Sequence, residues 1–134
     1  MSIKLDSETI SSINVFSNVT AVFPRDCIIE PNRIIFVVNQ GQAGMSIGKN
    51  GSKLKILESM FKKDVLVIEF SDDPVKFLEN VLRPNKLISG YIATDNKDVK
   101  KLEASIQGRL SISKIKLAKS LMQRYFNIMS INIR

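Results

Sequence analysis

The chain has 134 residues, of which 44% are hydrophobic and 25% are charged, which is typical of a folded globular protein. It contains no histidine, the commonest general base and metal ligand, so the composition argues against most hydrolytic and zinc chemistry. The single cysteine, Cys27, cannot form an internal disulfide, and its isoleucine neighbours predict a buried thiol. The first ten residues lack the apolar core of a signal peptide, and no apolar run has the roughly 18 residues needed to span a bilayer. We therefore expect a cytoplasmic protein with no membrane partner.

The excess positive charge is unevenly distributed. The formal net charge is +7, but residues 1–86 contain 11 Lys and Arg against 10 Asp and Glu, whereas residues 87–134 contain 9 against 3. No acidic residue follows Glu103. Such asymmetry indicates a polyanionic partner, most simply nucleic acid, although a solvated helix face on a basic protein gives the same counts.

The first half of the chain predicts a helix, a hairpin, a glycine-rich connection, a second helix and a strand. The first helix covers residues 6–18, with apolar residues spaced by three and with Asp6 or Ser7 as its N-cap. The run "CIIEPNRIIFVVN" predicts a hairpin that turns at Pro31 and Asn32. After the glycines, "SKLKILESMF" predicts a helix and "DVLVIEF" a strand, which we expect at the centre of its sheet because it is continuously apolar.

The second half repeats this order. A helix capped by Ser71 or Asp72, with Pro74 in its first turn, ends before Pro84. The strands "KLISGYIAT" and "VKKLEASI" follow, then a helix over residues 113–126 and the strand "IMSINIR". The segment "SKLKIL" of the first half recurs 61 residues later as "SKIKLA". We therefore predict an α+β chain of two copies of one unit, residues 1–72 and residues 73–134.

The stretch "NQGQAGMSIGKNGSKLKILESM", residues 39–60, contains four of the six glycines. A P-loop that binds nucleotide phosphates has the pattern G-x-x-x-x-G-K-[ST]. Here three residues, not four, separate Gly44 from Gly48, and Asn50 stands where the magnesium-binding hydroxyl is required. The spacing argues against phosphate hydrolysis, and we expect no enzymatic activity.

The same residues form a G-x-x-G turn, from Gly48 to Gly51, that leads into a helix. The two glycines permit positive φ angles and remove Cβ atoms that would block a close ligand, and backbone N–H groups at a helix start attract phosphate. Lys49 and Asn50 would project from the turn, and Ile47 would wall a groove for unstacked bases together with Leu54 or Ile56. The pattern predicts a clamp for the backbone of single-stranded RNA or DNA, but a bare G-x-x-G also occurs in structural helix–helix turns.

Two longer motifs carry a family resemblance. The segment "VVNQGQAGMSIGKNG" resembles the loop of the first KH domain of NusA proteins, and "DDPVKFLENVLRP" resembles the helix that leads to their second KH domain. The length fits the archaeal NusA-like proteins, which consist of two KH domains and are assigned to transcription termination or elongation. The resemblance implies two tandem type II KH domains, each a small three-stranded sheet covered on one face by helices. It also implies a monomer that binds single-stranded RNA, with RNA polymerase as a further partner and with no cofactor and no small-molecule substrate.

The resemblance assigns RNA contacts to one unit and leaves the other open. In the first unit, the matching residues are Ile47, Gly48, Lys49, Asn50, Gly51, Lys53 and Lys55. In the second unit, the 61-residue offset places Arg109-Leu110-Ser111-Ile112 at the loop, where both glycines are missing. Either this unit is a structural partner, or it binds phosphates electrostatically through Arg109, Lys114, Lys116 and Lys119. We expect Leu110 and Ile112 to begin the helix and to pack inward.

Two other functions are compatible with the sequence. The KH units of a protein–protein adaptor would serve as scaffolds, and the basic C-terminal half would dock on an acidic surface of RNA polymerase. A KH module of the ribosome or of RNA-decay machinery is a further alternative, against which the "DDPVKFLENVLRP" linker argues.

Overall fold

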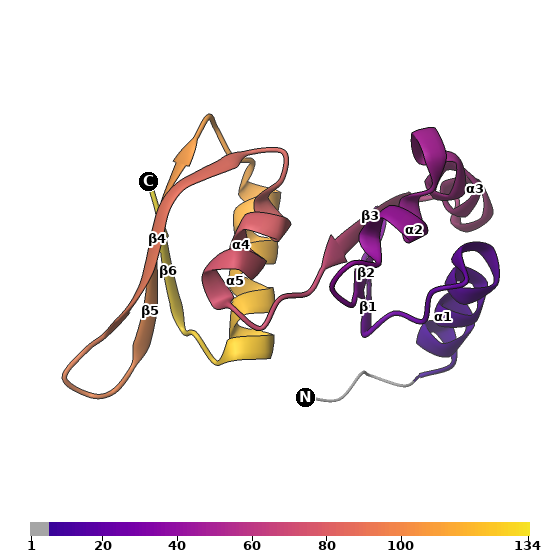
Figure 1. The fold of residues 1–134 in the computed structure, drawn as a ribbon. Helices are drawn as coiled ribbons and strands as arrows, with labels where there is room; N and C mark the ends of the chain where they lie inside the picture. Colours follow the sequence, from indigo (N-terminus) through magenta and orange to yellow (C-terminus); the bar gives the residue numbers. More distant parts are fainter. Residues whose placement is uncertain (1–5) are drawn as a thin grey trace. The chain divides into compact units, whose positions relative to one another are not determined.

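The computed structural model describes residues 6–134, which divide into two compact units with the boundary along the chain between Phe70 and Ser71. Each unit combines helices with one three-stranded sheet (Figure 1), so the predicted α+β fold is confirmed. The elements of the first unit are α1 (Ser7–Thr20), β1 (Asp26–Ile29), β2 (Arg33–Val38), α2 (Ala43–Ile47), the 3₁₀ turn η1 (Lys49–Gly51), α3 (Ser52–Phe61) and β3 (Asp64–Glu69). The elements of the second unit are α4 (Pro74–Leu82), β4 (Lys86–Thr94), β5 (Lys100–Gln107), α5 (Ile112–Phe126) and β6 (Ser130–Ile133).

Helix α1 begins and ends as its local sequence dictates. The Asp6 carboxylate accepts a hydrogen bond from the Thr9 backbone N–H at 2.8 Å, which confirms the predicted N-cap. The helix ends at Ala21, which adopts the left-handed conformation and donates its N–H to the Ser17 carbonyl. One stripe of α1, including Ile13 and Phe16, is buried against the sheet.

The first sheet has the strand order β1-β2-β3. Strands β1 and β2 form the predicted antiparallel hairpin, and β3 pairs with the free edge of β2 in parallel, with Phe36 opposite Val67. The prediction that β3 is the central strand is therefore wrong. A hairpin leaves β2 one open edge, and a crossover through α2 and α3 returns the chain to that edge, so β2 becomes central however apolar β3 is.

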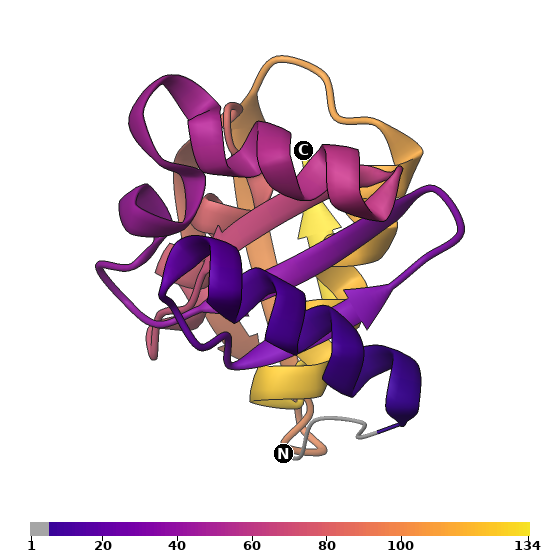
Figure 2. The same cartoon turned by 90° about the vertical axis from the view of Figure 1, so that its right-hand side faces the viewer.

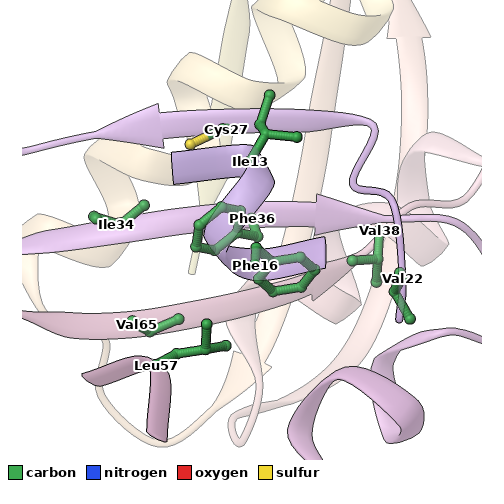
Figure 3. Close-up of a cluster of buried hydrophobic side chains, with 9 residues drawn as sticks. All are labelled: Ile13, Phe16, Val22, Cys27, Ile34, Phe36, Val38, Leu57 and Val65. Carbon is green, nitrogen blue, oxygen red and sulfur yellow. The ribbon is translucent and has the colours of Figure 1, made fainter. Parts of the chain in front are cut away.

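The core of the first unit lies between this sheet and the helices α1 and α3, which stand in front of the strands in Figure 2. Figure 3 shows Phe16 of α1 against Phe36 of β2, and the two ring centroids are 4.2 Å apart. Cys27 belongs to the same cluster and is 5% exposed, as predicted. Burial, together with the negative charge of Asp26, raises the pKa of the Cys27 thiol to about 12, so the thiol is protonated and unreactive at neutral pH.

The second sheet has the order β4-β5-β6, with β4 antiparallel and β6 parallel to the central strand β5. Helices α4 and α5 lie on one side of it (Figure 1). The N-cap of α4 is Asp73, which accepts from the Val75 N–H at 3.0 Å, and not Ser71 or Asp72 as predicted. Phe77 of α4 is fully buried and lies 5.5 Å from the Tyr125 ring of α5.

The two units differ in the connection from the central strand to the long helix. The first connection, residues 39–51, contains α2 and η1, whereas the second connection, residues 108–111, has four residues. Residues 71–134 are all described, and they contain no counterpart of α2. The units thus share the predicted order of helix, two strands, helix and strand, with one added short helix in the first.

Candidate nucleic-acid interface

The first connection makes a tight turn between α2 and α3. The Gly48 N–H donates to the Gly44 carbonyl at 3.0 Å and ends α2, and the Gly51 N–H donates to the Gly48 carbonyl at 3.1 Å. Gly48, Asn50 and Gly51 have φ angles of +79°, +58° and +73°. Asparagine is one of the few residues besides glycine that adopt such a conformation, so the sequence G-K-N-G fits this backbone.

Gly48 is required for space as well as for conformation. A Cβ atom at this position would lie 2.8 Å from Lys53 Cγ and 2.9 Å from Ser52 Oγ. At Gly51, in contrast, a Cβ would meet no described atom within 4 Å. The Gly48 side of the turn is therefore packed against α3, while the Gly51 side is open to an approaching ligand.

The start of α3 is open as well. Its N-cap is Gly51, and among the described residues no side chain caps the first turn. Lys49 and Asn50 are exposed beside it. The Gly51 and Ser52 N–H groups donate within the turn, to the carbonyls of Gly48 and Lys49. The positive end of the helix dipole and the exposed lysine favour the binding of an anion such as a phosphate group.

The other predicted residues of the first unit have different positions. The Lys53 ammonium donates to the Thr20 carbonyl at 3.3 Å and so braces the C-terminus of α1, whereas Lys55 is exposed. Ile47 is half-buried beside the turn. Of the two residues expected to wall the groove with Ile47, Leu54 packs on the core and Ile56 is 49% exposed.

The second connection is closed by side chains of its own unit. Asn85 Nδ2 donates to the carbonyls of Gln107 at 3.3 Å and of Arg109 at 3.2 Å. Ser111 caps α5 by accepting from the Lys114 N–H at 3.2 Å, and the Lys114 ammonium donates to the Arg83 carbonyl at 2.5 Å.

Three of the four basic residues proposed for this unit, Arg109, Lys116 and Lys119, are exposed, while Lys114 is half-buried. The expectation that Ile112 packs inward is wrong, because the Ser111 cap makes Ile112 the first helical residue and leaves it 72% exposed. Leu110 is half-buried. The second connection thus has surface charge but lacks the open turn of the first.

The family model of the KH domain matches residues 10–86, more than half of the chain, and this range includes the whole turn between α2 and α3. The chain belongs to the KH-domain family. The matched range also covers β1, β2 and β3, and so the whole sheet of the first unit.

The similarity to curated relatives identifies the chain as an archaeal NusA-like KH protein. The "Probable transcription termination protein NusA" of Methanocaldococcus jannaschii is 36% identical over 97 residues, which cover 72% of this chain and 53% of the relative. The chain thus spans about half the length of that protein. The protein of the same name from Halobacterium salinarum is 28% identical over 138 residues, 99% of both chains.

A solved structure, the crystal structure of APE1850, superimposes with a TM-score of 0.80 at 27% identity and covers 97% of this chain and 100% of that one. The KH-domain match and the NusA-named relatives point to a protein without catalytic activity. No helix within residues 6–134 is long and apolar enough to cross a membrane.

The structure adds two basic residues to the KH surface that sequence reasoning missed. A pocket of about 410 Å³ lies where α4 leads into β4, and it is lined by Glu79, Arg83, Pro84, Asn85, Lys86 and Leu87. The side chains of Arg83 and Lys86 are exposed here, and Asn85 ties this segment to Arg109. The sequence predicts only that a helix ends before Pro84 and that a strand begins at Lys86, and the hydrogen bond from Asn85 to Arg109, 24 residues away, leaves no signal in the local sequence.

Proposed function

We propose that this KH protein is an RNA-binding transcription factor of the NusA type that holds single-stranded RNA at the Gly48–Gly51 turn. The observation that carries the proposal is the open side of this turn. The backbone at Gly51 is unobstructed, the start of α3 has no side-chain cap among the described residues, and Lys49 is exposed beside it. A phosphate placed there would accept hydrogen bonds from backbone N–H groups and would neutralise the lysine.

Single-stranded RNA fits better than a duplex. A turn of four residues clamps a short stretch of backbone, and recognition by KH domains leaves the bases unstacked against an adjacent groove. The half-buried Ile47 and the exposed Met45 of α2 supply apolar surface next to the turn. In the cell, we place this monomer in the cytoplasm, where nascent RNA and RNA polymerase would be its partners.

The second unit would contribute phosphate contacts without a clamp. Arg109, Lys116 and Lys119 are exposed, and Arg83 and Lys86 add charge near Arg109. Lys114 contributes less in this proposal, because its ammonium already donates to a backbone carbonyl. Contacts of this kind raise affinity uniformly across RNA sequences and weaken as salt is added.

The test is a double variant, Lys49→Asp with Asn50→Asp, titrated with a labelled single-stranded RNA. Its matched control, Ser59→Asp with Lys62→Asp, makes the same change in charge at the far end of α3, about 15 Å away. We expect the loop variant to lose about tenfold or more in affinity, because the aspartates repel the phosphate, and the control to lose much less. Equal losses in both variants would mean that general charge, and not the turn, binds RNA. Unchanged affinity of the folded loop variant would overturn the assignment.

A further inference from the structure

The sheet of the second unit has one face that its own helices do not cover. On β4, a Cβ at Gly90 would lie 3.0 Å from Val75 Cγ1 of α4, so Gly90 faces the helices. Side chains alternate along a strand, and the neighbouring Ser89 and Tyr91 therefore face the other way. On β5, Leu102 and Ala104 are buried toward the helices. The strand register then places Ser89, Tyr91, Ala93, Lys101, Glu103, Ser105, Ser130 and Asn132 on the outer face, and Arg134 lines a hollow on this face.

Tyr91 is the large side chain of this outer face, and it is 60% exposed. It stands directly opposite Glu103, and Ser89 stands opposite Ser105. Directly opposed residues have Cβ atoms about 5 Å apart, so the tyrosine ring and the carboxylate border the same space. That space is a shallow hollow of about 100 Å³ lined by Ser89, Tyr91, Glu103, Ala104, Ser105 and Arg134.

The composition of the outer face favours a nucleic acid over an apolar protein surface. An aromatic ring is surrounded here by hydroxyl groups, one carboxylate and two exposed cations, Lys101 and Arg134. Protein docking sites are centred on contiguous apolar area, whereas the residues that line this hollow are polar apart from Ala104 and the tyrosine ring. A sheet that presents an aromatic ring is, in contrast, a stacking surface for a base of single-stranded RNA.

We propose that the outer face binds one base of single-stranded RNA, which stacks on Tyr91 and donates hydrogen bonds to Glu103. Lys101 and Arg134 contact the flanking phosphates. The proposal rests on the proposed function, since it assigns a second contact to the same RNA. It gives the second unit, which lacks the glycine turn, a binding mode of its own.

The carboxylate of Glu103 restricts which base is bound. An ionised carboxylate accepts hydrogen bonds and cannot donate them. Adenine, cytosine and guanine carry exocyclic amino groups that donate, whereas uracil donates only through N3–H, which lies between two carbonyl oxygens that repel a carboxylate. We therefore expect oligocytidine or oligoadenine to bind more tightly than oligouridine at equal length and salt. Glu103→Gln keeps the shape and adds a donor, so it should reduce this preference.

The chain has two tyrosines, Tyr91 and Tyr125, which makes the site directly observable. Full-length protein labelled with 3-fluorotyrosine gives two ¹⁹F signals, and Tyr91→Phe assigns them. On titration with oligocytidine of eight nucleotides, the Tyr91 signal should shift while that of Tyr125, half-buried against Phe77, stays in place. Tyr91→Ala should lower affinity about fivefold or more, and Tyr91→Phe, which retains the stacking ring, should keep it.

The outcomes separate the two proposals. If RNA binds, as measured by anisotropy, but the Tyr91 signal does not move, the outer-face site is wrong and the glycine turn is unaffected. Suppose that the wild type and the Lys49→Asp, Asn50→Asp variant bind RNA with equal affinity and that the Tyr91 signal shifts equally in both. The outer-face site would then be supported, and the assignment of RNA binding to the glycine turn would be wrong. A Tyr91 signal that responds to RNA polymerase and not to RNA would overturn the proposal in favour of a protein partner.

Discussion

The two strand-to-helix connections join equivalent elements of the two units, but one is long and open and the other is short and closed by side chains. Each leads from the central strand of a three-stranded sheet to the long helix that packs on it. The second connection does so in four residues, with Ser111 capping α5 and Asn85 holding the backbone. The first uses thirteen residues, ends in Gly51 and leaves the start of α3 without a side-chain cap among the described residues.

The difference shows that the fold itself does not require the glycine turn. The second unit builds a buried core from α4, α5 and its sheet while its short connection satisfies its own polar groups. The longer connection leaves the start of α3 without a side-chain cap among the described residues, and its Gly51 and Ser52 N–H groups donate only to carbonyls of the turn itself. The fold therefore does not need the additional residues of the first unit, which is why we propose a binding role for them.

The largest expected effect comes from Gly48→Ala, with Gly51→Ala as its matched control. Both residues have positive φ angles, so both substitutions introduce backbone strain of about 1 kcal/mol. Only at Gly48 would the new Cβ also meet atoms closer than 3.0 Å, on Lys53 and Ser52. We expect Gly48→Ala to lower the free energy of unfolding by about 2–3 kcal/mol and Gly51→Ala by about 1 kcal/mol, as measured by urea denaturation.

RNA titration of the same pair sharpens the comparison. Gly51 borders the open side of the turn, where a methyl group would obstruct a phosphate, so Gly51→Ala should weaken RNA binding more than its effect on stability suggests. If Gly51→Ala bound RNA like the wild type, Gly51 would be needed only for the backbone conformation of the turn and not for the approach of RNA.

Much of the fold could be predicted because its signals are local. Asp6 and the turn at Pro31 and Asn32 mark element boundaries through their own side-chain and backbone chemistry. The buried state of Cys27 followed from its apolar neighbours. The positions of Gly48 and Gly51 were predictable for the same reason, since positive φ angles select glycine in the sequence.

The features that the sequence does not predict depend mostly on relations between distant segments. The apolar run of β3 indicates burial but does not say which neighbour the strand has, and the crossover placed it at an edge. The basic pattern of α3 does not reveal that Lys53 reaches Thr20, 33 residues away. Ile112 was expected inside because it is apolar, yet the local cap at Ser111 determined its direction. The first two cases required the tertiary structure, whereas the third depends on the local cap.

A smaller effect distinguishes Lys53 from Lys55 on α3. Lys53→Met removes the hydrogen bond to the Thr20 carbonyl and should cost about 1 kcal/mol of stability with little change in RNA affinity. Lys55 is exposed, so Lys55→Met should leave stability within about 0.5 kcal/mol and lower RNA affinity at low salt. The measurements are urea unfolding and RNA titration of both variants. If instead Lys53→Met lowered RNA affinity without lowering stability, Lys53 would give up its hydrogen bond to Thr20 and bind RNA.

The smallest expected effect tests how the second connection is held. Asn85→Ala removes two hydrogen bonds to backbone carbonyls, both at an exposed site, and should lower the stability of the second unit by about 1 kcal/mol or less. Asn96→Ala, at an exposed position before β5, is the control and should have no measurable effect. Urea unfolding followed by circular dichroism gives the change in stability.

Cys27 locates that change within the molecule. It is the single cysteine and lies in the core of the first unit, so alkylation of its thiol under native conditions reports the opening of that unit. Asn85→Ala should leave the alkylation rate unchanged, because the lost hydrogen bonds belong to the second unit. A faster alkylation would show that the short connection stabilises both units, and the two connections would then not be independent solutions. An unchanged rate together with lower stability would confirm that Asn85 holds the second connection and that the first unit does not depend on it.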